Sequence, residues 1–292
     1  MAIAEAADEN DKAALQRLAG DDYSTEISAN RVSILDLLDR FPTVDLPFST
    51  FLTLLPPMRS FPSFYSSISS SPLWNPNHVT LSYGVLSAPK LADKFKVYEG
   101  VASHYMSNLQ VGDRIHVAVR PSHASFHLPH DAENMPVIFV AAGTGLAPFR
   151  GFVQERAAQL GAGRKLAPAH LFFGCRGPAD DLYREELDRW QKLGAVEVHR
   201  AFSRQDPQNE TQGCRHVQDR LYHDRESMKD LWQAGARVYV CGSRQVGEGV
   251  KQVMLRIRRE TLAAANKSET EEESDKWFTR IRNERYATDV FD

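Results

Sequence analysis

Residues 136–151 decide the fold, and they read Pro136-Val-Ile-Phe-Val-Ala-Ala-Gly-Thr-Gly-Leu-Ala-Pro-Phe-Arg-Gly151. The first half is an apolar run typical of a buried strand. The glycine turn Gly143-Thr-Gly145 follows it, and Pro148 is suited to open the next helix. Such a turn lets backbone N–H groups approach a phosphate at a helix N-terminus. Because Gly-Lys-Ser/Thr is missing, the turn is not a P-loop.

The pattern continues to the C-terminus as short apolar strands alternating with helices. Strands are expected at 136–142, 169–174, 196–202 and 237–241, and helices at 148–160, 183–193, 215–222 and 226–234. Two long helices follow at 246–265 and 269–283, the last with the capping-box pair Ser268 and Glu271. Residues 286–292 are too apolar and aromatic to be a frayed tail. The alternation predicts an α/β, doubly wound parallel sheet.

The first part of the chain has a different organisation. Helices are expected at 11–18, 32–41 and 47–55, and a further helix at 100–109. Strands are expected at 63–69, 79–86 and 113–119, and an extended loop and strand at 122–129. A Ser- and Pro-rich turn at 70–76 separates the first two strands like a hairpin loop.

Composition excludes several classes of protein. A net charge of -3 provides no basic field for nucleic acid or anionic lipid, and no apolar run is long enough to cross a bilayer. The N-terminal residues do not form a secretory signal. Three scattered cysteines, Cys175, Cys214 and Cys241, form neither a disulfide framework nor a zinc site, so we expect no metal and a reducing, cytoplasmic location.

A family resemblance emerges from the motifs taken together. Gly143-Thr-Gly-Leu-Ala-Pro-Phe-Arg-Gly151 resembles the NADP-binding loop of the ferredoxin–NADP reductase superfamily. The diflavin branch, cytochrome P-450 reductase and its fused relatives, is indicated by the downstream strings Phe173-Gly-Cys-Arg176, Leu182-Tyr-Arg-Glu-Glu186, Ala201-Phe-Ser-Arg204, Val217-Gln218 and Tyr239-Val-Cys-Gly242. The fungal P-450-fused type is closest, through Ser69-Ser-Ser-Pro-Leu-Trp-Asn-Pro76 and Cys214-Arg-His-Val-Gln-Asp-Arg220.

The resemblance, which runs from about Asp11 to the C-terminus, implies three regions. They are a helical connecting segment (1–58), a partial antiparallel β-barrel that binds FAD and carries the helical segment as an insertion (59–132), and a Rossmann-like NADP-binding domain (133–292). The resemblance implies that the chain starts inside the insertion, without the earlier barrel strands or an FMN-binding module. We therefore expect an N-terminally truncated reductase.

The resemblance also assigns a site for NADPH. Ser203, Arg204, Arg215 and Gln218 are implied to bind the 2′-phosphate, Gly143, Thr144 and Gly145 the phosphates, and Arg176 the pyrophosphate. A hydroxyl and guanidinium groups suit a dianionic phosphate. The strand end at Ser203 lacks the acidic residue that reads the ribose of NAD, so NADPH is preferred over NADH.

A second implied site is the reaction centre. Cys241 would lie beside the nicotinamide, and Asp289 would assist hydride transfer. Phe291 stands where relatives usually have a tryptophan stacked on the flavin. Cys241 ends a strand at the edge where open α/β sheets bind ligands.

The flavin contacts are the least regular part of the match. Gly100, Val101, Ala102 and Ser103 are implied to meet the FAD pyrophosphate at a helix start. The family pattern Arg-x-Tyr-Ser-Ile-Ser-Ser meets Pro62-Ser-Phe-Tyr-Ser-Ser-Ile-Ser-Ser70. Aligned on Ile68, Phe64 replaces the arginine and Ser67 is the catalytic serine. With one residue inserted, Tyr65 and Ser66 form the stacking pair and Ser63 replaces the arginine.

Two functions follow from these assignments. The first is an enzyme that passes hydride from NADPH to FAD, and then electrons to an FMN-binding module or a haem protein. The second, motivated by the missing arginine and the shortened barrel, is an NADP(H)-binding remnant without stable FAD or catalysis. A stand-alone ferredoxin-type reductase fits less well, because the helical insertion is a diflavin feature.

Overall fold

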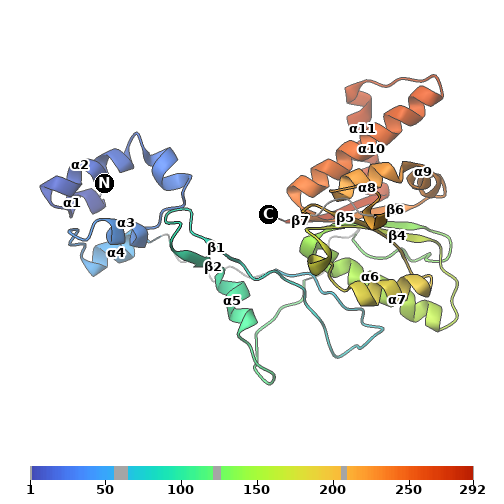
Figure 1. Cartoon of the computed structure of the whole chain (residues 1–292), viewed down its shortest axis with the longest axis horizontal. Helices are drawn as coiled ribbons and strands as arrows, with labels where there is room; N and C mark the ends of the chain where they lie inside the picture. The colour runs from blue at the N-terminus through green and yellow to red at the C-terminus, as the bar shows by residue number, and fades with distance from the viewer. Residues whose placement is uncertain (1, 56–64, 121–125, 205–208, 292) are drawn as a thin grey trace. The chain divides into compact units, whose positions relative to one another are not determined.

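The computed structural model describes residues 2–55, 65–120, 126–204 and 209–291. They form two compact units (Figure 1). The first unit is Met1–Tyr65 with Gly84–Arg114, and the second is Ser66–Tyr83 with Ile115–Asp292. Residues 66–83 thus group with the C-terminal part of the chain, although the boundaries drawn from the sequence place them within 59–132.

A five-stranded parallel sheet is the centre of the second unit, in the order β5-β4-β3-β6-β7. The strands are β3 (Val137–Ala142), β4 (Ala169–Cys175), β5 (Glu197–Phe202), β6 (Arg237–Ser243) and β7 (Tyr286–Phe291). Every residue of β4 is buried, as its almost wholly apolar sequence requires for a strand covered on both faces. The predicted doubly wound parallel sheet is confirmed.

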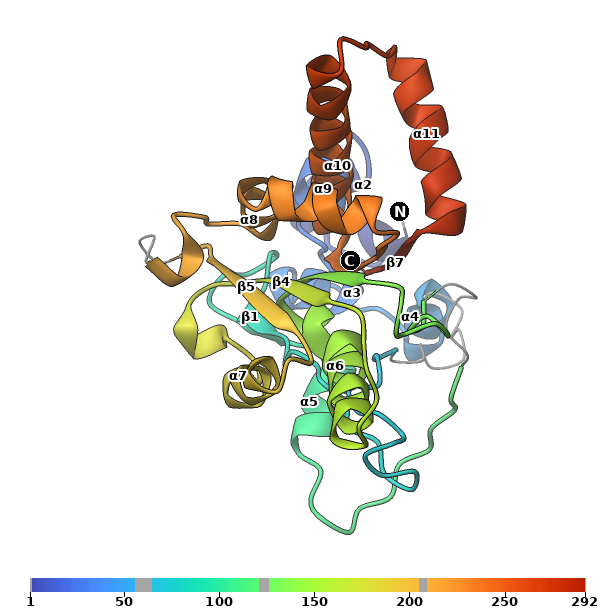
Figure 2. The ribbon, with the colours of Figure 1, turned by 90° about the vertical axis from the view of Figure 1, so that its right-hand side faces the viewer.

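Helices cover both faces of this sheet (Figure 2). One face carries α6 (Leu146–Gly161) and α7 (Arg184–Lys192); the other carries α8 (Val217–His223), α9 (Arg225–Gln233), α10 (Arg244–Ala264) and α11 (Glu271–Glu284). The alternating side chains of the strands therefore form two apolar cores. Phe139, Phe149 and Tyr239 lie in the first, and Ile138, Phe172 and Val240 in the second. Short 3-10 turns, η2 (Gly143–Gly145), η3 (Pro178–Asp180) and η4 (Asn209–Thr211), lie at the carboxyl edge or in the loops after it.

The last strand, β7, was not predicted as a strand. The sequence indicated only that residues 286–292 are ordered. It runs parallel to β6, with Cys241 opposite Asp289 and Ser243 opposite Phe291. Tyr286 anchors its start, 5.0 Å from Phe278 of α11 between ring centroids. The capping box expected at Ser268 and Glu271 is wrong by two residues, because Thr270 and Glu273 make the reciprocal bonds.

Residues 66–83 lie on α6 as an irregular segment. A single antiparallel bridge joins Ile68 to Leu81, in place of the two strands expected at 63–69 and 79–86; residues 63 and 64 lie outside the described residues. Ser69, Ser70 and Ser71 are buried. A side chain at Gly151 would come within 3.3 Å of the Ser70 backbone, so glycine permits this close approach.

The first unit is mostly helical. It contains α1 (Ala2–Glu5), α2 (Glu9–Ala19), the π-helix η1 (Tyr23–Ser28), α3 (Ile34–Arg40), α4 (Phe48–Leu54) and α5 (Val101–Ser107), and the antiparallel pair β1 (Ser87–Pro89) and β2 (Val97–Glu99).

The strand expected at 113–119 is wrong. Ile115, Val117 and Val119 alternate as in a strand, but they are exposed and find no pairing partner among the described residues. Residues 121–125 of the predicted 122–129 loop and strand lie outside the described residues.

Candidate active site

The glycine turn packs directly against the end of β6. Gly143 has a φ of 54°, a conformation that favours glycine. A Cβ atom at Gly145 would lie 2.2 Å from the carbonyl oxygen of Cys241, which leaves no room for any side chain. Thr144, between the two glycines in the sequence, is half-buried. The turn therefore exposes backbone rather than side chains at the carboxyl edge of the sheet.

Three residues assigned to the reaction centre meet at this edge. Cys241 is fully buried, and its register partner on β7 is Asp289. Ser67 Oγ donates a hydrogen bond of 3.3 Å to Asp289 Oδ2. Burial raises the pKa of the Cys241 thiol, and the Asp289 carboxylate raises it further, so the sulfur stays protonated at neutral pH. Cys241 is thus suited to a positioning role rather than to attack as a thiolate.

Arg150 holds the segment that carries Ser67, a role that the sequence did not suggest. Its Nη1 donates to the carbonyl oxygen of Ser69 over 2.7 Å and to Thr80 Oγ1 over 3.2 Å. Its Nε and Nη2 form a bidentate pair with Glu186 at 2.7 and 2.9 Å, and its guanidinium lies 4.5 Å from the centroid of the Tyr183 ring. Arg150 lies in the motif Gly143–Gly151 and Glu186 in the motif Leu182–Glu186. Membership of these motifs was the sequence signal that could have indicated a role for the two residues.

Ser203 and Arg204 continue β5 beyond its last residue. The backbone N–H of Ser203 donates to the carbonyl oxygen of Cys175, and the N–H of Arg204 donates to the carbonyl oxygen of Arg176, both over 2.9 Å. Arg176 is exposed and forms a bidentate pair with Asp180 at 2.7 and 3.0 Å. Hydrogen bonding by Arg176 lowers the pKa of Asp180, and the charge of Arg204 adds to the effect. The structure thus gathers Arg176, Ser203 and Arg204 at one strand edge.

The other two predicted phosphate ligands lie at the start of α8. Arg215 is exposed and precedes the helix, whose capping box is formed by His216 and Asp219. Gln218 packs over α10, where a Cβ at Gly249 would lie 3.5 Å from the Cδ atom of Gln218. Val217 packs against β4, where a Cβ at Gly174 would lie 3.1 Å from the Cβ of Val217. The first turn of α8 therefore lies against the carboxyl end of β4.

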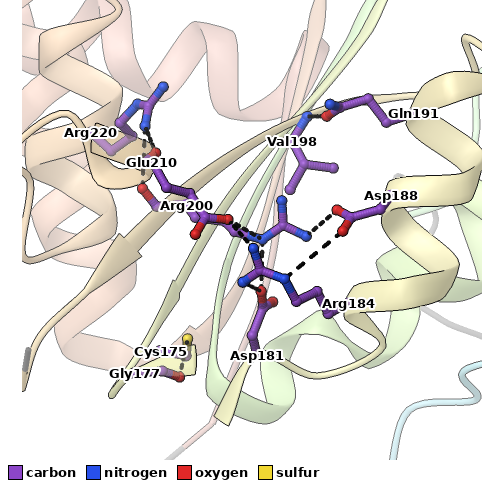
Figure 3. Close-up of polar contacts among 10 residues, drawn as sticks. All are labelled: Cys175, Gly177, Asp181, Arg184, Asp188, Gln191, Val198, Arg200, Glu210 and Arg220. Carbon is purple, nitrogen blue, oxygen red and sulfur yellow. Dashed lines mark hydrogen bonds and ion pairs between the residues drawn. The ribbon is translucent and has the colours of Figure 1, made fainter. Parts of the chain in front are cut away.

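A buried ion-pair network supports the loops at this edge (Figure 3). Asp181 is fully buried and accepts from Arg200 Nε over 2.7 Å and from Arg184 Nη1 over 2.9 Å. Arg200 Nη2 also donates to Asp188 of α7 over 2.7 Å. Burial raises the pKa of Asp181 against the pull of the two arginines. The network connects β5 to the loop between β4 and α7.

The same network extends to α8. Arg184 Nη2 donates to Glu210 Oε1 over 2.6 Å, and Arg220 Nη1 donates to the carbonyl oxygen of Glu210 over 2.9 Å (Figure 3). Glu210 lies in η4, in the loop that follows Arg204. Sequence reasoning missed these residues, because each charged side chain looked by itself like an ordinary surface residue.

The helix start assigned to FAD belongs to the first unit. Gly100 is the N-cap of α5, and a Cβ there would lie 2.8 Å from Ser103 Oγ. Ser103 is buried; its hydroxyl accepts from the Leu86 N–H and donates to the Gly100 carbonyl, both over 3.1 Å. Val101 is exposed and Ala102 half-buried. Ser103 therefore joins the helix start to residue 86.

The aromatic and serine residues assigned to the flavin are distributed over both units. Tyr65 is exposed in the first unit, whereas Ser66 Oγ donates to the Ser82 carbonyl over 3.4 Å within the second. Phe291, at the end of β7, is 45% exposed. Phe64 and Ser63, the two positions considered for the missing arginine, lie outside the described residues.

Comparison with known families agrees with this architecture. A family model described as FAD binding domain matches residues 2–105, and one described as oxidoreductase NAD-binding domain matches residues 139–252. Together the two matches are those of the FAD-binding and NAD-binding domains of the ferredoxin–NADP reductase superfamily. Among the described residues, no helix combines the length and apolar character needed to span a membrane.

Comparison with individual proteins specifies the branch of this superfamily that the chain resembles. The chain is 54% identical, over its full length, to a bifunctional cytochrome P-450/NADPH–P-450 reductase of Fusarium oxysporum. It is 46% identical, over 92% of its length, to a self-sufficient cytochrome P-450 monooxygenase of Phanerodontia chrysosporium. The chain belongs to the NADPH–cytochrome P-450 reductase-like family, in the fungal P-450-fused type. It spans about a quarter of these relatives, 27% of the first and 25% of the second.

Proposed function

We propose that the chain is the FAD- and NADPH-binding part of an NADPH–haemoprotein reductase. The observation that carries the proposal is the convergence of Gly145, Cys241, Asp289 and Ser67 at one edge of the parallel sheet. The glycine turn would receive the pyrophosphate of NADPH, with Arg176 nearby. Ser203 and Arg204, with Arg215 and Gln218, would bind the 2′-phosphate, since hydroxyl and guanidinium donors match a dianionic phosphate.

The reaction centre supports hydride transfer by placement. FAD, when bound, would supply the hydride acceptor and release electrons one at a time. Cys241 would limit where the nicotinamide ring can lie. Ser67 would donate its hydroxyl proton to Asp289, so that the serine oxygen and the carboxylate are held together beside the reacting ring. Phe291, half exposed at the end of β7, would cover the flavin and move aside for the nicotinamide.

The flavin side of the proposal includes a domain division. The proposed division is a helical segment (1–58), a partial antiparallel barrel (59–132) and the NADP-binding domain (133–292). The matches at 2–105 and 139–252 support a flavin-binding part followed by a nucleotide-binding part. Tyr65, Ser66 and residues 100–103 would contact FAD, the latter through the backbone at the start of α5. The electron acceptor would be a haem protein, as the name of the P-450-fused relative suggests, or an FMN-binding module.

The test starts from the purified protein with added FAD. We expect bound flavin and NADPH-dependent reduction of ferricyanide. The double variant Ser203→Ala with Arg204→Ala should weaken NADPH binding at least about 100-fold, because each of the two charge-assisted hydrogen bonds contributes about 1.5–3 kcal/mol. Its activity with NADH should be unchanged. Arg189→Ala, on the exposed side of α7, is the matched control.

Two results would reject the proposal. An unchanged NADPH affinity in the double variant would remove the nucleotide site from this edge. A protein that ignores added FAD, yet is stabilised against heat by NADP, would instead support the NADP(H)-binding remnant motivated by the missing arginine.

A further inference from the structure

Two histidines and a glutamate cluster at the amino edge of the sheet, opposite the carboxyl edge that holds the candidate active site. His170 is the second residue of β4, and Glu197 and His199 belong to the edge strand β5. His170 and Glu197 are register partners on the neighbouring strands. The rigid sheet therefore places three potential metal ligands side by side, in a location that the reductase chemistry does not use.

The distances in the cluster match the coordination sphere of a small transition-metal ion. His170 Nδ1 lies 3.0 Å from His199 Nε2, and the carboxylate of Glu197 lies 3.7 Å from the first nitrogen and 3.5 Å from the second. The two Glu197 distances end at different oxygens of its carboxylate, and one ligand atom from each of the three residues lies within 4.8 Å of the other two. A modest adjustment of the side chains would bring these atoms to the bond length of about 2 Å that zinc has with nitrogen and oxygen.

The surroundings orient one of these ligands. His199 Nδ1 lies 2.8 Å from Asp224 Oδ2, at the junction of α8 and α9, and Arg220 Nε pairs with the same carboxylate oxygen over 2.8 Å. A proton held between Nδ1 and Asp224 leaves the Nε2 lone pair directed at His170, where it accepts the Nδ1–H of that ring in the metal-free chain. On metal binding this proton would move to Nε2 of His170 or to water, so that both facing nitrogens can bind the ion. A carboxylate behind a ligating histidine is the usual outer contact of histidine at metal sites.

Burial keeps both imidazoles in the form that binds metals. His170 and His199 are 9% and 6% exposed, and the His199 ring stacks on Phe172 with 4.5 Å between centroids. Removal from water lowers the pKa of both imidazoles. Glu197, in contrast, is 61% exposed by its side chain, so the site has an open side through which an ion and a water ligand can enter.

We propose that His170, Glu197 and His199 bind a divalent transition-metal ion of the zinc class, with water as the fourth ligand. Imidazole nitrogens exclude calcium and magnesium, which prefer all-oxygen sites. The ion would hold β4 and β5 together and, through Asp224, connect them to the α8–α9 junction. This departs from the sequence-based expectation of no metal, which considered only the cysteines.

The experiment uses the full chain, free of any affinity tag and stripped with a chelator. Zn²⁺ is titrated by calorimetry, and Co²⁺ is used as an absorbing substitute that reports the coordination geometry. We expect one ion per chain, tetrahedral Co²⁺ absorption and a higher melting temperature with Zn²⁺. None of these readouts depends on FAD or NADPH.

Variants assign the ion to the cluster. Glu197→Gln, at an exposed position that tolerates change, should weaken Zn²⁺ binding at least about tenfold, and His199→Gln should abolish it. Asp224→Asn should weaken binding by about 10- to 100-fold through the orientation of His199. The control is Glu226→Gln, an exposed glutamate on α9, which should bind Zn²⁺ like the unaltered chain.

Two outcomes would overturn the proposal. If the unaltered chain binds no Zn²⁺ at micromolar concentration, the two histidines form only a hydrogen-bonded pair. If Glu197→Gln and His199→Gln remain folded by circular dichroism and still bind one ion with unchanged affinity, the ion lies at other histidines.

Discussion

Ser67 Oγ donates a hydrogen bond to Asp289 Oδ2 across 222 residues of sequence. Two devices bring these residues together. The parallel pairing of β7 with β6 places Asp289 opposite Cys241, and Arg150 fixes the segment that carries Ser67 to the α6 side of the unit. The candidate active site therefore depends on groups that lie outside it.

The Ser67–Asp289 pair should act as one unit in hydride transfer. Ser67→Ala and Asp289→Asn should each slow flavin reduction by roughly 10- to 100-fold, the range for losing a hydrogen bond to a charged group. The double variant should be little slower than the worse single one, because the two changes remove the same interaction. Stopped-flow bleaching of the flavin by NADPH measures these rates. Effects that simply multiply would show that the two groups work independently.

Arg150 should contribute to stability far more than a surface arginine does. Arg150→Met leaves the Ser69 carbonyl and Glu186 without their partner, at an expected cost of about 3 kcal/mol in the free energy of unfolding. Arg164→Met removes the exposed pair with Glu133 and should cost less than about 1 kcal/mol. Urea unfolding followed by tryptophan fluorescence compares the two. Equal losses would mean that the Arg150 contacts contribute nothing beyond an ordinary surface pair.

Gly145 should tolerate no side chain. In Gly145→Ala the added methyl group meets the Cys241 carbonyl, so either the turn or β6 must shift, at a cost of about 1–3 kcal/mol. NADPH affinity should fall together with stability. Gly161→Ala, at the end of α6 where a Cβ meets nothing within 4 Å, should be neutral or stabilising by up to about 1 kcal/mol. Thermal melts and NADPH titration of both variants provide the measurement. Unaltered stability in Gly145→Ala would show that the close approach is absent in solution.

Acid should loosen the start of α3. Hydrogen bonds from the Ser33 hydroxyl and backbone lower the pKa of Asp36 from 3.8 to about 2. The folded chain then binds fewer protons than the unfolded chain in this range, so stability falls as pH drops from about 4 to about 2. The expected loss is about 1 kcal/mol, the usual worth of a helix cap. Hydrogen exchange of the α3 amides, corrected for intrinsic rates, measures it. Asp36→Asn should remove this pH dependence; if the dependence persists, another carboxylate is responsible.

Several features of the molecule follow from the sequence alone. The apolar strand runs, the glycine turn and the helices between them predicted the parallel sheet, because these signals lie within a few neighbouring residues. The motif residues Cys241, Asp289 and Ser67 were also assigned from the sequence, and the structure places them side by side. Their catalytic roles stay predictions.

Only the tertiary structure decided the remaining features. Whether an alternating segment becomes a strand depends on a partner, so residues 113–119 were wrongly predicted and β7 was missed as a strand. The ion pairs of Arg150 and Asp181, and the His170–Glu197–His199 cluster, join side chains whose distance in sequence carries no information about their distance in space. Strand register and helix packing set those distances, because both are determined by burial of the whole apolar surface rather than by any local run of residues.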